Sequence, residues 1–538
     1  MRRLLGVGVS LMSIFAYGDT HVDALGLYQP SQFEVEQGAA CTQCRVSPQA
    51  RWYFRHETFL VPRQGEPVVT IEDSKHWLED VEALNPTALP SLVWTGSRHL
   101  WTQMTLEGHT QRVTTADGQR FQFALVPKIA SNRSYWNART TDFFANQPLR
   151  IRGELVDQTV IARTVWPQAY KLDLAATMRP LQAEESLQSL VQDAKGGARR
   201  PHESRLLWEK SPGLAQQSAG KAVLGILLNG AQGDDDEAHG GHFALATGHV
   251  AADGGYASWL VNNYYSLATH SEKGIIAGVT PFDQYMGDLN SGQAFYRPSY
   301  MVVAVFSQPQ VPSQVQALSN RVMQHFYRHD IVYDHALENC AGISMDTLRQ
   351  LGWRVPLRGV ESSLKASAAY WVVAATEHSL QKGRAMYDYL NTEMTRLFPA
   401  VAFDAIGNDL LHIARTGQTT TLDAGVMQGM ASQLEAIYFV RIPQIPSSRA
   451  DGQAPVYRFA QYLQQAPADR SQWKIIPVTP NPLPNHLQPD VPTQAPRPAL
   501  LPLPAFLMLV SVIGLVALLL YCAWRWLKRN AQIHPTGK

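Results

Sequence analysis

Among the four cysteines of this 538-residue chain, Cys340 has the surroundings that best suit covalent chemistry. It follows Asn339, a favourable N-cap residue, and it precedes an apolar helical pattern that ends at Gly352. The free N–H groups and partial positive charge of a helix N-terminus favour a thiolate, and the same N–H groups could hold an oxyanion. The pattern therefore predicts a thiol nucleophile that attacks an ester or amide and forms an acyl-enzyme. A single cysteine beside small residues can also be a buried packing residue, so this prediction needs a partner base.

His242 is the candidate base. It opens the segment GHFALATG (241–248), which is typical of a strand, and the turn residues 253–255 separate this segment from a second strand-like segment, 256–265. A neutral imidazole within hydrogen-bond reach of the thiol could remove its proton, and a polar third group could orient the ring.

The parity of the expected hairpin selects that third group. With an even number of loop residues, Asn263 and Tyr265 share a face with His242, whereas a three-residue loop would place Asn262 there instead. Even loops are somewhat commoner for a Gly-Gly turn, so we favour Asn263. His249 is an odd number of positions from His242 and is expected on the other face of its strand.

The acidic run 234–237, followed by His239 and His242, offers an alternative use of the same histidine. Carboxylate and imidazole groups at this spacing could bind a divalent metal. An acidic run is more often a solvated loop, and we expect a site without a metal or a cofactor.

The other cysteines have simpler interpretations. Cys41 and Cys44 form a CTQC pair that is expected to be a local disulfide in an oxidising compartment, although a redox role is also conceivable. Cys522 lies in an apolar segment and is expected to be a packing residue.

Both ends of the chain indicate export. Residues 1–18 combine two arginines, a short apolar stretch and a small-x-small site, as in a signal peptide. Residues 505–524 carry no charge and have the length of about 20 residues that a helix needs to cross a bilayer. The tail 525–538 contains Arg and Lys without acidic residues, which places it in the cytoplasm. We therefore expect a single-pass protein of the cell membrane whose bulk is periplasmic or otherwise extracytoplasmic.

The pattern between these ends predicts an α+β protein in several parts. Residues 31–175 are expected to form a β-rich domain, 205–355 a mixed domain that carries Cys340, 356–470 a helical region, and 471–504 an extended proline-rich linker. Charged residues make up 17 % of the chain and the net charge is +1, so no basic field suggests a nucleic acid as partner.

Three segments resemble a known family: GHFALATG (241–248), NNYYSLA (262–268) and YDHALENC (333–340). Together they resemble the periplasmic domain family of the lipoprotein N-acyltransferase Lnb. That family belongs to the circularly permuted papain-like superfamily, which also contains lecithin:retinol acyltransferase-like enzymes. The resemblance covers residues 221–353 and does not extend to the β-rich region.

The resemblance implies a permuted papain-like catalytic domain with Cys340 as nucleophile and His242 as base. From the strand and helix patterns rather than from the resemblance, we expect Asn263, or else Asn262, to orient the histidine. Asn339, which shapes the helix start, and Tyr265 are expected to be binding residues. The implied function is that of a thiol acyltransferase or hydrolase whose partner is a membrane lipid or lipoprotein substrate. Two alternatives stay open: a papain-like cell-wall peptidase, and a non-enzymatic envelope binding or assembly protein in which the β-rich domain is the functional part.

Overall fold

The computed structural model describes residues 34–37, 58–61, 93–464 and 500–533, with short gaps. The gaps within 93–464 are at 98, 109–110, 129–133, 233–238, 266–276, 328–330, 332, 334–337, 358–362, 420, 423–425, 459 and 462–463. The expected signal peptide, Cys41 and Cys44, the acidic run 234–237 and nearly all of the proline-rich linker lie outside the described residues.

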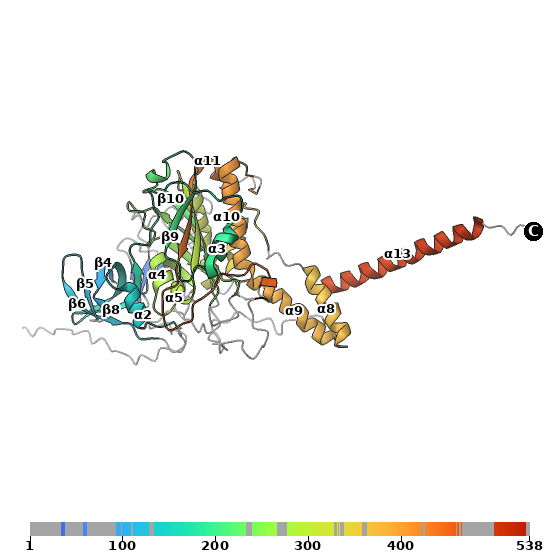
Figure 1. Cartoon of the computed structure of the whole chain (residues 1–538), viewed down its shortest axis with the longest axis horizontal. Helices are drawn as coiled ribbons and strands as arrows, with labels where there is room; N and C mark the ends of the chain where they lie inside the picture. Colours follow the sequence, from blue (N-terminus) through green and yellow to red (C-terminus); the bar gives the residue numbers. More distant parts are fainter. Residues whose placement is uncertain are drawn as a thin grey trace, which may run out of the picture.

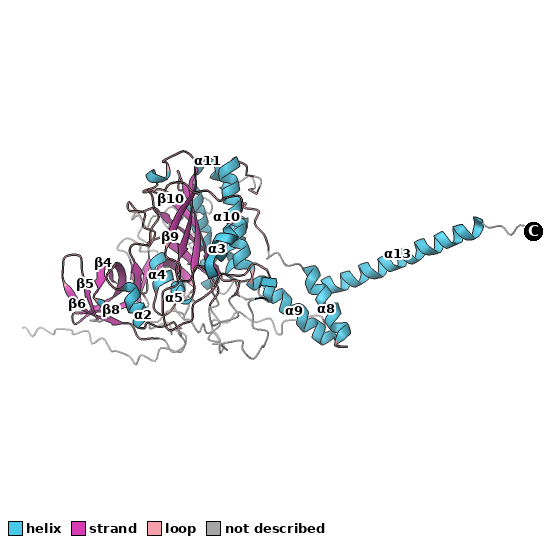
Figure 2. Ribbon diagram, viewed as in Figure 1, coloured by secondary structure: helices cyan, strands magenta, loops and turns pink. Residues whose placement is uncertain are grey.

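The described chain is a mixed α+β protein with two β-sheets, as the sequence predicts (Figure 2). The larger sheet has ten strands among the described residues. In spatial order they are β1 (Glu34–Gln37), β2 (Thr58–Val61), β3 (Val93–Trp94), β13 (Gly278–Pro281), β12 (Leu260–Asn263), β11 (His242–His249), β10 (Ala222–Asn229), β14 (Ser299–Phe306), β15 (Leu434–Ile442) and β9 (Glu203–Glu209).

The central strands of this sheet are apolar on both faces because both faces are covered. Along β10, Leu224 and Ile226 belong to the core on one face, whereas Val223 and Leu227 belong to the core on the other. Successive side chains of a strand point to opposite faces, so a strand buried on both sides reads as a continuous apolar run.

Helices cover one face of the sheet. They are α3 (Leu187–Gly196), α6 (Gln310–Tyr327), α7 (Cys340–Gln350) and α10 (Phe398–Thr416). Helices α6, α7 and α10 all contact β11, which places the predicted cysteine helix against the predicted histidine strand.

The smaller sheet is a closed barrel that covers part of the other face. Its strands follow the order β4 (His99–Leu106), β5 (Arg112–Thr114), β6 (Arg120–Leu125), β8 (Thr159–Pro167) and β7 (Pro148–Val156). The barrel lies at one end of the molecule, with α2 (Ala138–Phe144) beside it (Figure 1). The strands of the expected β-rich domain 31–175 are thus divided, since β1, β2 and β3 join the larger sheet.

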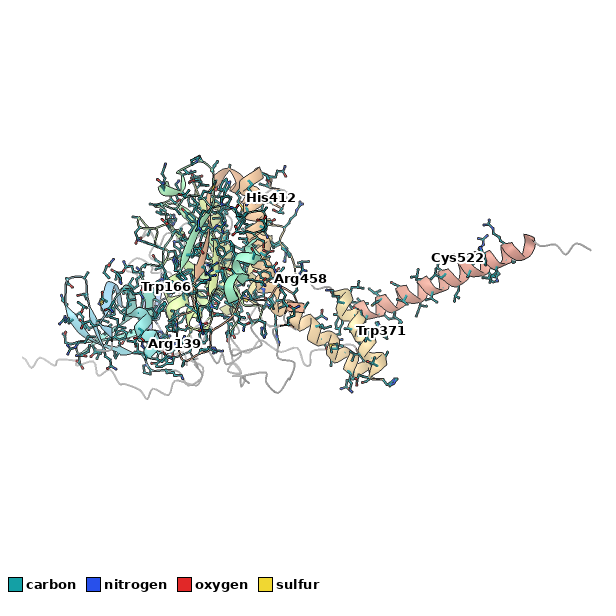
Figure 3. All side chains as sticks on the ribbon, in the orientation of Figure 1. Arg139, Trp166, Trp371, His412, Arg458 and Cys522 are labelled. Carbon is teal, nitrogen blue, oxygen red and sulfur yellow. The ribbon has the colours of Figure 1, made fainter. Side chains whose placement is uncertain are left out.

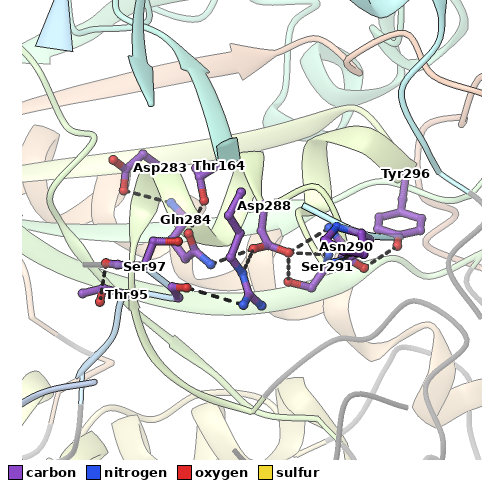
Figure 4. Close-up of polar contacts among 12 residues, drawn as sticks. Thr95, Ser97, Thr164, Asp283, Gln284, Asp288, Asn290, Ser291 and Tyr296 are labelled. Atoms are coloured by element: carbon purple, nitrogen blue, oxygen red, sulfur yellow. Dashed lines mark hydrogen bonds and ion pairs between the residues drawn. The ribbon is translucent and has the colours of Figure 1, made fainter. Parts of the chain in front are cut away.

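Buried ion pairs join the barrel to α4 (Phe282–Gly287). Asp283 is fully buried and receives Arg150 Nε at 3.1 Å and Arg152 Nη2 at 3.0 Å. Arg163 Nε contacts Asp288 Oδ2 at 2.8 Å, and Gln284 Nε2 donates to the same oxygen at 2.8 Å (Figure 4). These pairs fix the barrel against the segment that precedes α5 (Gln293–Tyr296) and β14.

The expected helical region 356–470 contains helices but also a strand of the main sheet. It comprises α8 (Ser363–Thr376), α9 (Leu380–Arg396), α10, the short turns η6 (Val426–Gly429) and α11 (Met430–Gln433), and then β15 between β14 and β9. The apolar run of β15 is buried on both faces, and such a run has no period that distinguishes a strand from a buried helix.

The expected membrane span lies within α13 (Leu503–Ile533), which extends away from the body (Figure 1). Its segment Leu503–Arg529 is long and apolar enough to cross a membrane, and most of its side chains are exposed.

Replacing Asp283 by Ala should lower the free energy of unfolding by about 3–5 kcal/mol, because the buried guanidinium of Arg152 and the partly buried guanidinium of Arg150 would lose their counter-charge. Chemical denaturation of the purified chain measures this loss. The matched control is Glu377→Ala, which removes a solvent-exposed pair with Lys382 and should leave the unfolding midpoint almost unchanged. Equal shifts in the two variants would contradict the structural role given to Asp283.

Candidate functional site

Cys340 is the first residue of α7, as the sequence predicts. Asn339 is the N-cap, and its Oδ1 accepts the N–H groups of Ala341 and Gly342, each at 3.1 Å. Ile343, Met345 and Leu348 anchor the helix in the core between β11 and α10. Helix α7 therefore holds the thiol in place, because any movement of the helix would expose these apolar side chains to water.

The electrostatics of the thiol differ from the sequence-based expectation. Burial raises the pKa of the Cys340 thiol above its ordinary value. Hydrogen bonds from the backbone N–H of Phe243 and the hydroxyl of Tyr333, together with the charge of Arg297, favour the thiolate but do not outweigh burial. The helix N-terminus alone therefore does not produce a thiolate, and the group needs a base.

The hydrogen bond from Phe243 places the thiol beside the first residues of β11. His242, the first residue of that strand, is one position away along the chain. His242, Asn263 and Cys340 are each only 3 % exposed. The contact with Phe243 brings the buried thiol to the end of β11 where His242 contacts Asn263.

Asn263 contacts the imidazole of His242. Its Oδ1 lies 2.7 Å from His242 Nε2. An amide oxygen only accepts hydrogen bonds, so Nε2 must carry the proton, which leaves Nδ1 as the basic nitrogen of the neutral ring.

The register of the hairpin explains why Asn263 and not Asn262 occupies this position. Leu245 pairs with Asn262 and Thr247 with Leu260, so Asn263 lies on the same face as His242, as an even loop predicts. Asn262 faces α6, where its Nδ2 donates to Gln316 Oε1 at 3.1 Å. His249 lies at the other end of β11, about 23 Å from His242 at the usual rise of a strand.

Aromatic side chains surround the histidine. The ring of Tyr265 lies edge-on to His242 with centroids 6.2 Å apart, and it packs against Tyr333 at 5.7 Å. The Tyr333 hydroxyl exchanges hydrogen bonds with Cys340, accepting its backbone N–H and donating to its sulfur. Tyr333 begins the YDHALENC segment, but nothing in the sequence indicated that its hydroxyl would reach the thiol.

Three further residues near His242 and Cys340 come from other helices and strands. No local sequence pattern could show that these elements lie close to the site. Tyr285 of α4 lies 6.5 Å from the His242 ring, and its hydroxyl donates to Asn229 Oδ1. Asn229 is the partner of His242 across the β10–β11 ladder. Buried Arg297, between α5 and β14, supplies the positive charge near Cys340 while its guanidinium binds Gln293.

The remaining sequence expectations concern metals and the other cysteine. Within the described ranges, no group of three or more His, Cys, Asp or Glu side chains could hold a metal ion, and the acidic run 234–237 lies outside those ranges. Cys522 is exposed on α13 (Figure 3).

A cavity of about 470 Å³ lies in the barrel. It is lined by Leu106, Gly108, Gln111, Phe123, Ala124, Leu125, Trp136 and Thr141. The Cys340 side chain is buried, and the Tyr333 hydroxyl accepts the N–H at the start of α7.

Replacing Tyr333 by Phe should raise the pKa of the Cys340 thiol further, because the thiolate would lose a hydrogen bond. The midpoint of the pH dependence of iodoacetamide alkylation, followed on the Cys340 peptide by mass spectrometry, should move up by about one unit or more. The alkylation rate at high pH, where the thiol is fully ionised, measures how easily iodoacetamide reaches the sulfur, and this measurement is independent of the pKa. Tyr135→Phe, which removes a hydroxyl bonded to Val126 O in another part of the molecule, should leave the midpoint unchanged. A midpoint that stays or falls in Tyr333→Phe would contradict the assigned hydrogen bond.

Comparisons of the chain with protein-family models, with curated proteins and with solved structures found no match.

Proposed function

We propose that this protein is an extracytoplasmic, membrane-tethered acyltransferase or hydrolase that works through a Cys340–His242 pair. The observation that carries the proposal is the buried arrangement at the start of β11. Asn263 fixes the Nε2 proton of His242, and the neighbouring residue, Phe243, binds the Cys340 sulfur. A thiol whose pKa is raised by burial is a poor nucleophile alone, and an oriented neutral imidazole is the group that it lacks.

The proposed reaction begins with proton transfer from the Cys340 thiol to His242 Nδ1. The thiolate attacks the carbonyl carbon of an ester, and the carbonyl oxygen becomes an oxyanion. The leaving alcohol takes the proton back from the imidazolium as the C–O bond breaks, and a thioester remains on Cys340. An amine or water then attacks the thioester with His242 as base, which releases the acylated product and regenerates the thiol.

The oxyanion would bind at the start of α7. The backbone N–H of Cys340 points toward this position, and it is bound by the Tyr333 hydroxyl. A substrate carbonyl would take the place of that hydroxyl, so Tyr333 would move when the substrate enters. The N–H groups of Ala341 and Gly342 are already bound to Asn339 and are not available for this purpose.

The substrate class is inferred from the anchor and from the sequence resemblance. Helix α13 would hold the site near a bilayer, where ester-linked acyl chains are abundant. The segments that resemble the Lnb-like periplasmic family contain both Cys340 and His242. In Lnb-type proteins, an ester-linked acyl chain of a lipoprotein is transferred to its N-terminal amine. We propose a lipoprotein or phospholipid acyl chain as the donor.

Incubation with a diacyl phospholipid or a diacylated lipoprotein should add the mass of one acyl chain to the Cys340 peptide. His242→Ala should slow formation of this adduct about 10²–10⁴-fold, because the thiol would lose its base. Cys340→Ser provides the background. Cleavage of a cell-wall peptide without any acyl adduct from lipid would refute acyl transfer and favour the peptidase.

Two adjacent buried asparagines provide a matched pair of variants. Asn263→Ala should reduce the rate of adduct formation about 10²-fold, because the imidazole would no longer be held in the reactive orientation. Asn262→Ala removes two hydrogen bonds with Gln316 of α6 and should lower the melting temperature without a comparable loss of rate per folded molecule. Similar rate losses in both variants would show that Asn263 has only a structural role.

A further inference from the structure

Helix α8 is apolar on two opposite faces. Ala366, Tyr370 and Ala374, spaced one turn apart, are buried. Leu364 and Val372 are displaced from them by two positions, which is about half a turn, and they are 65 % and 61 % exposed. A surface helix in water normally has one polar face, so the apolar composition of the exposed face requires an explanation.

The buried face of α8 packs against α9 and against the beginning of α13. A Cβ at Gly383 of α9 would lie 2.8 Å from Tyr370 O and 2.9 Å from Ala374 Cβ, so the two helices approach as closely as a glycine allows. Trp371 Nε1 donates to Ala505 O at 2.9 Å, and the Tyr370 hydroxyl donates to Leu500 O at 3.3 Å. Figure 3 shows Trp371 at this junction, where α13 leaves the hairpin of α8 and α9.

The position of this junction along α13 determines where α8 would lie relative to the bilayer. The apolar segment of α13 begins at Leu503, so Ala505 lies at its extracytoplasmic end. A helix that crosses a bilayer from there places Trp371 at the level of the lipid headgroups, where Trp is enriched. The exposed face of α8 is held at the same level.

The structure assigns the bilayer surface as the partner of the exposed face of α8. Leu364 and Val372 would lie among the headgroups and the first methylenes of the acyl chains, with Leu357 and Leu380 on either side of the helix in sequence. Among the described residues of α8, Lys365 is the one charged side chain, and a lysine near the headgroups can extend its ammonium toward phosphate. On the neighbouring helix α9, Arg384 pairs with Asp388.

This contact would fix the orientation of the body, because α9 continues into α10. Helix α10 packs on β10 and β11, the strand that begins with His242. A hairpin that rests on the bilayer therefore orients the sheet that carries the candidate site. The inference rests on α13 as a membrane span and does not depend on the proposed acyl transfer.

Spin labelling tests the assignment on the full chain in liposomes of phosphatidylethanolamine and phosphatidylglycerol. In a background of Cys41→Ser, Cys44→Ser, Cys340→Ala and Cys522→Ala, a nitroxide is attached after Val372→Cys. Leu515→Cys on α13 is the lipid control, and Glu154→Cys on the barrel is the aqueous control. The label at position 372 should collide more often with oxygen, which concentrates in lipid, than with a water-soluble nickel chelate. The lipid control at position 515 should give the same result, and the aqueous control at position 154 should give the opposite result.

The other outcomes overturn the assignment in distinguishable ways. More frequent collisions with nickel at 372 would place the face in water. Low collision rates with both reagents would show that a second copy or another protein covers it. A label at 515 that is not in lipid would remove the span on which the inference rests.

A second measurement retains all native cysteines, in case the cysteine-free chain does not fold. Lipids brominated near the headgroup should quench the fluorescence component that is lost in Trp371→Phe. The component lost in Trp353→Phe, which removes a fully buried indole, should not be quenched. Equal insensitivity of both components to the brominated lipids would refute the contact with the bilayer.

Discussion

The antiparallel register of β10, β11 and β12 determines which polar groups meet at the candidate site. Asn229, His242 and Asn263 lie on three neighbouring strands, and a shift of one residue would turn each side chain to the opposite face. The apolar residues on both sides of β10 and β11 prevent such a shift, because it would exchange residues between two differently shaped cores. The burial of apolar residues along the whole length of β10 and β11 therefore fixes the strand register, and the register fixes the position of the imidazole.

The same burial sets the chemical properties of the cysteine. Helix α7 begins at Cys340, and the Phe243 N–H, the Tyr333 hydroxyl and the charge of buried Arg297 act on the sulfur, yet the pKa of the thiol is raised. Desolvation of the charged form is the larger effect in this closed region. The resting thiol of Cys340 is consequently neutral, and it lies in the same buried part of the molecule as the imidazole of His242. In the proposed reaction, charge would develop only when a substrate displaces Tyr333 and supplies an electrophile.

Local patterns in the sequence were sufficient for the parts of the site that depend on one helix or one hairpin. Asn339 as N-cap and Cys340 in the first turn follow from capping preferences, and Asn263 follows from strand parity. Tyr285, Arg297 and Asn229 could not be found in this way, because the order of strands in the sheet brings them to His242 and Cys340. The same limit applies to β15, whose two-sided burial removes the period that identifies a strand.

A strand or helix with apolar residues on two opposite faces needs apolar material against each face. This requirement applies equally to β10 and to α8. For β10, the chain itself provides both, through the helices on one side and the barrel region on the other. For α8, the described chain provides one, through α9 and the start of α13. The second must come from outside, and a helix long and apolar enough to cross a membrane begins at the same point. Lipid is the apolar phase that such a helix would bring to this location, so the composition of α8 and the position of α13 are explained by one arrangement.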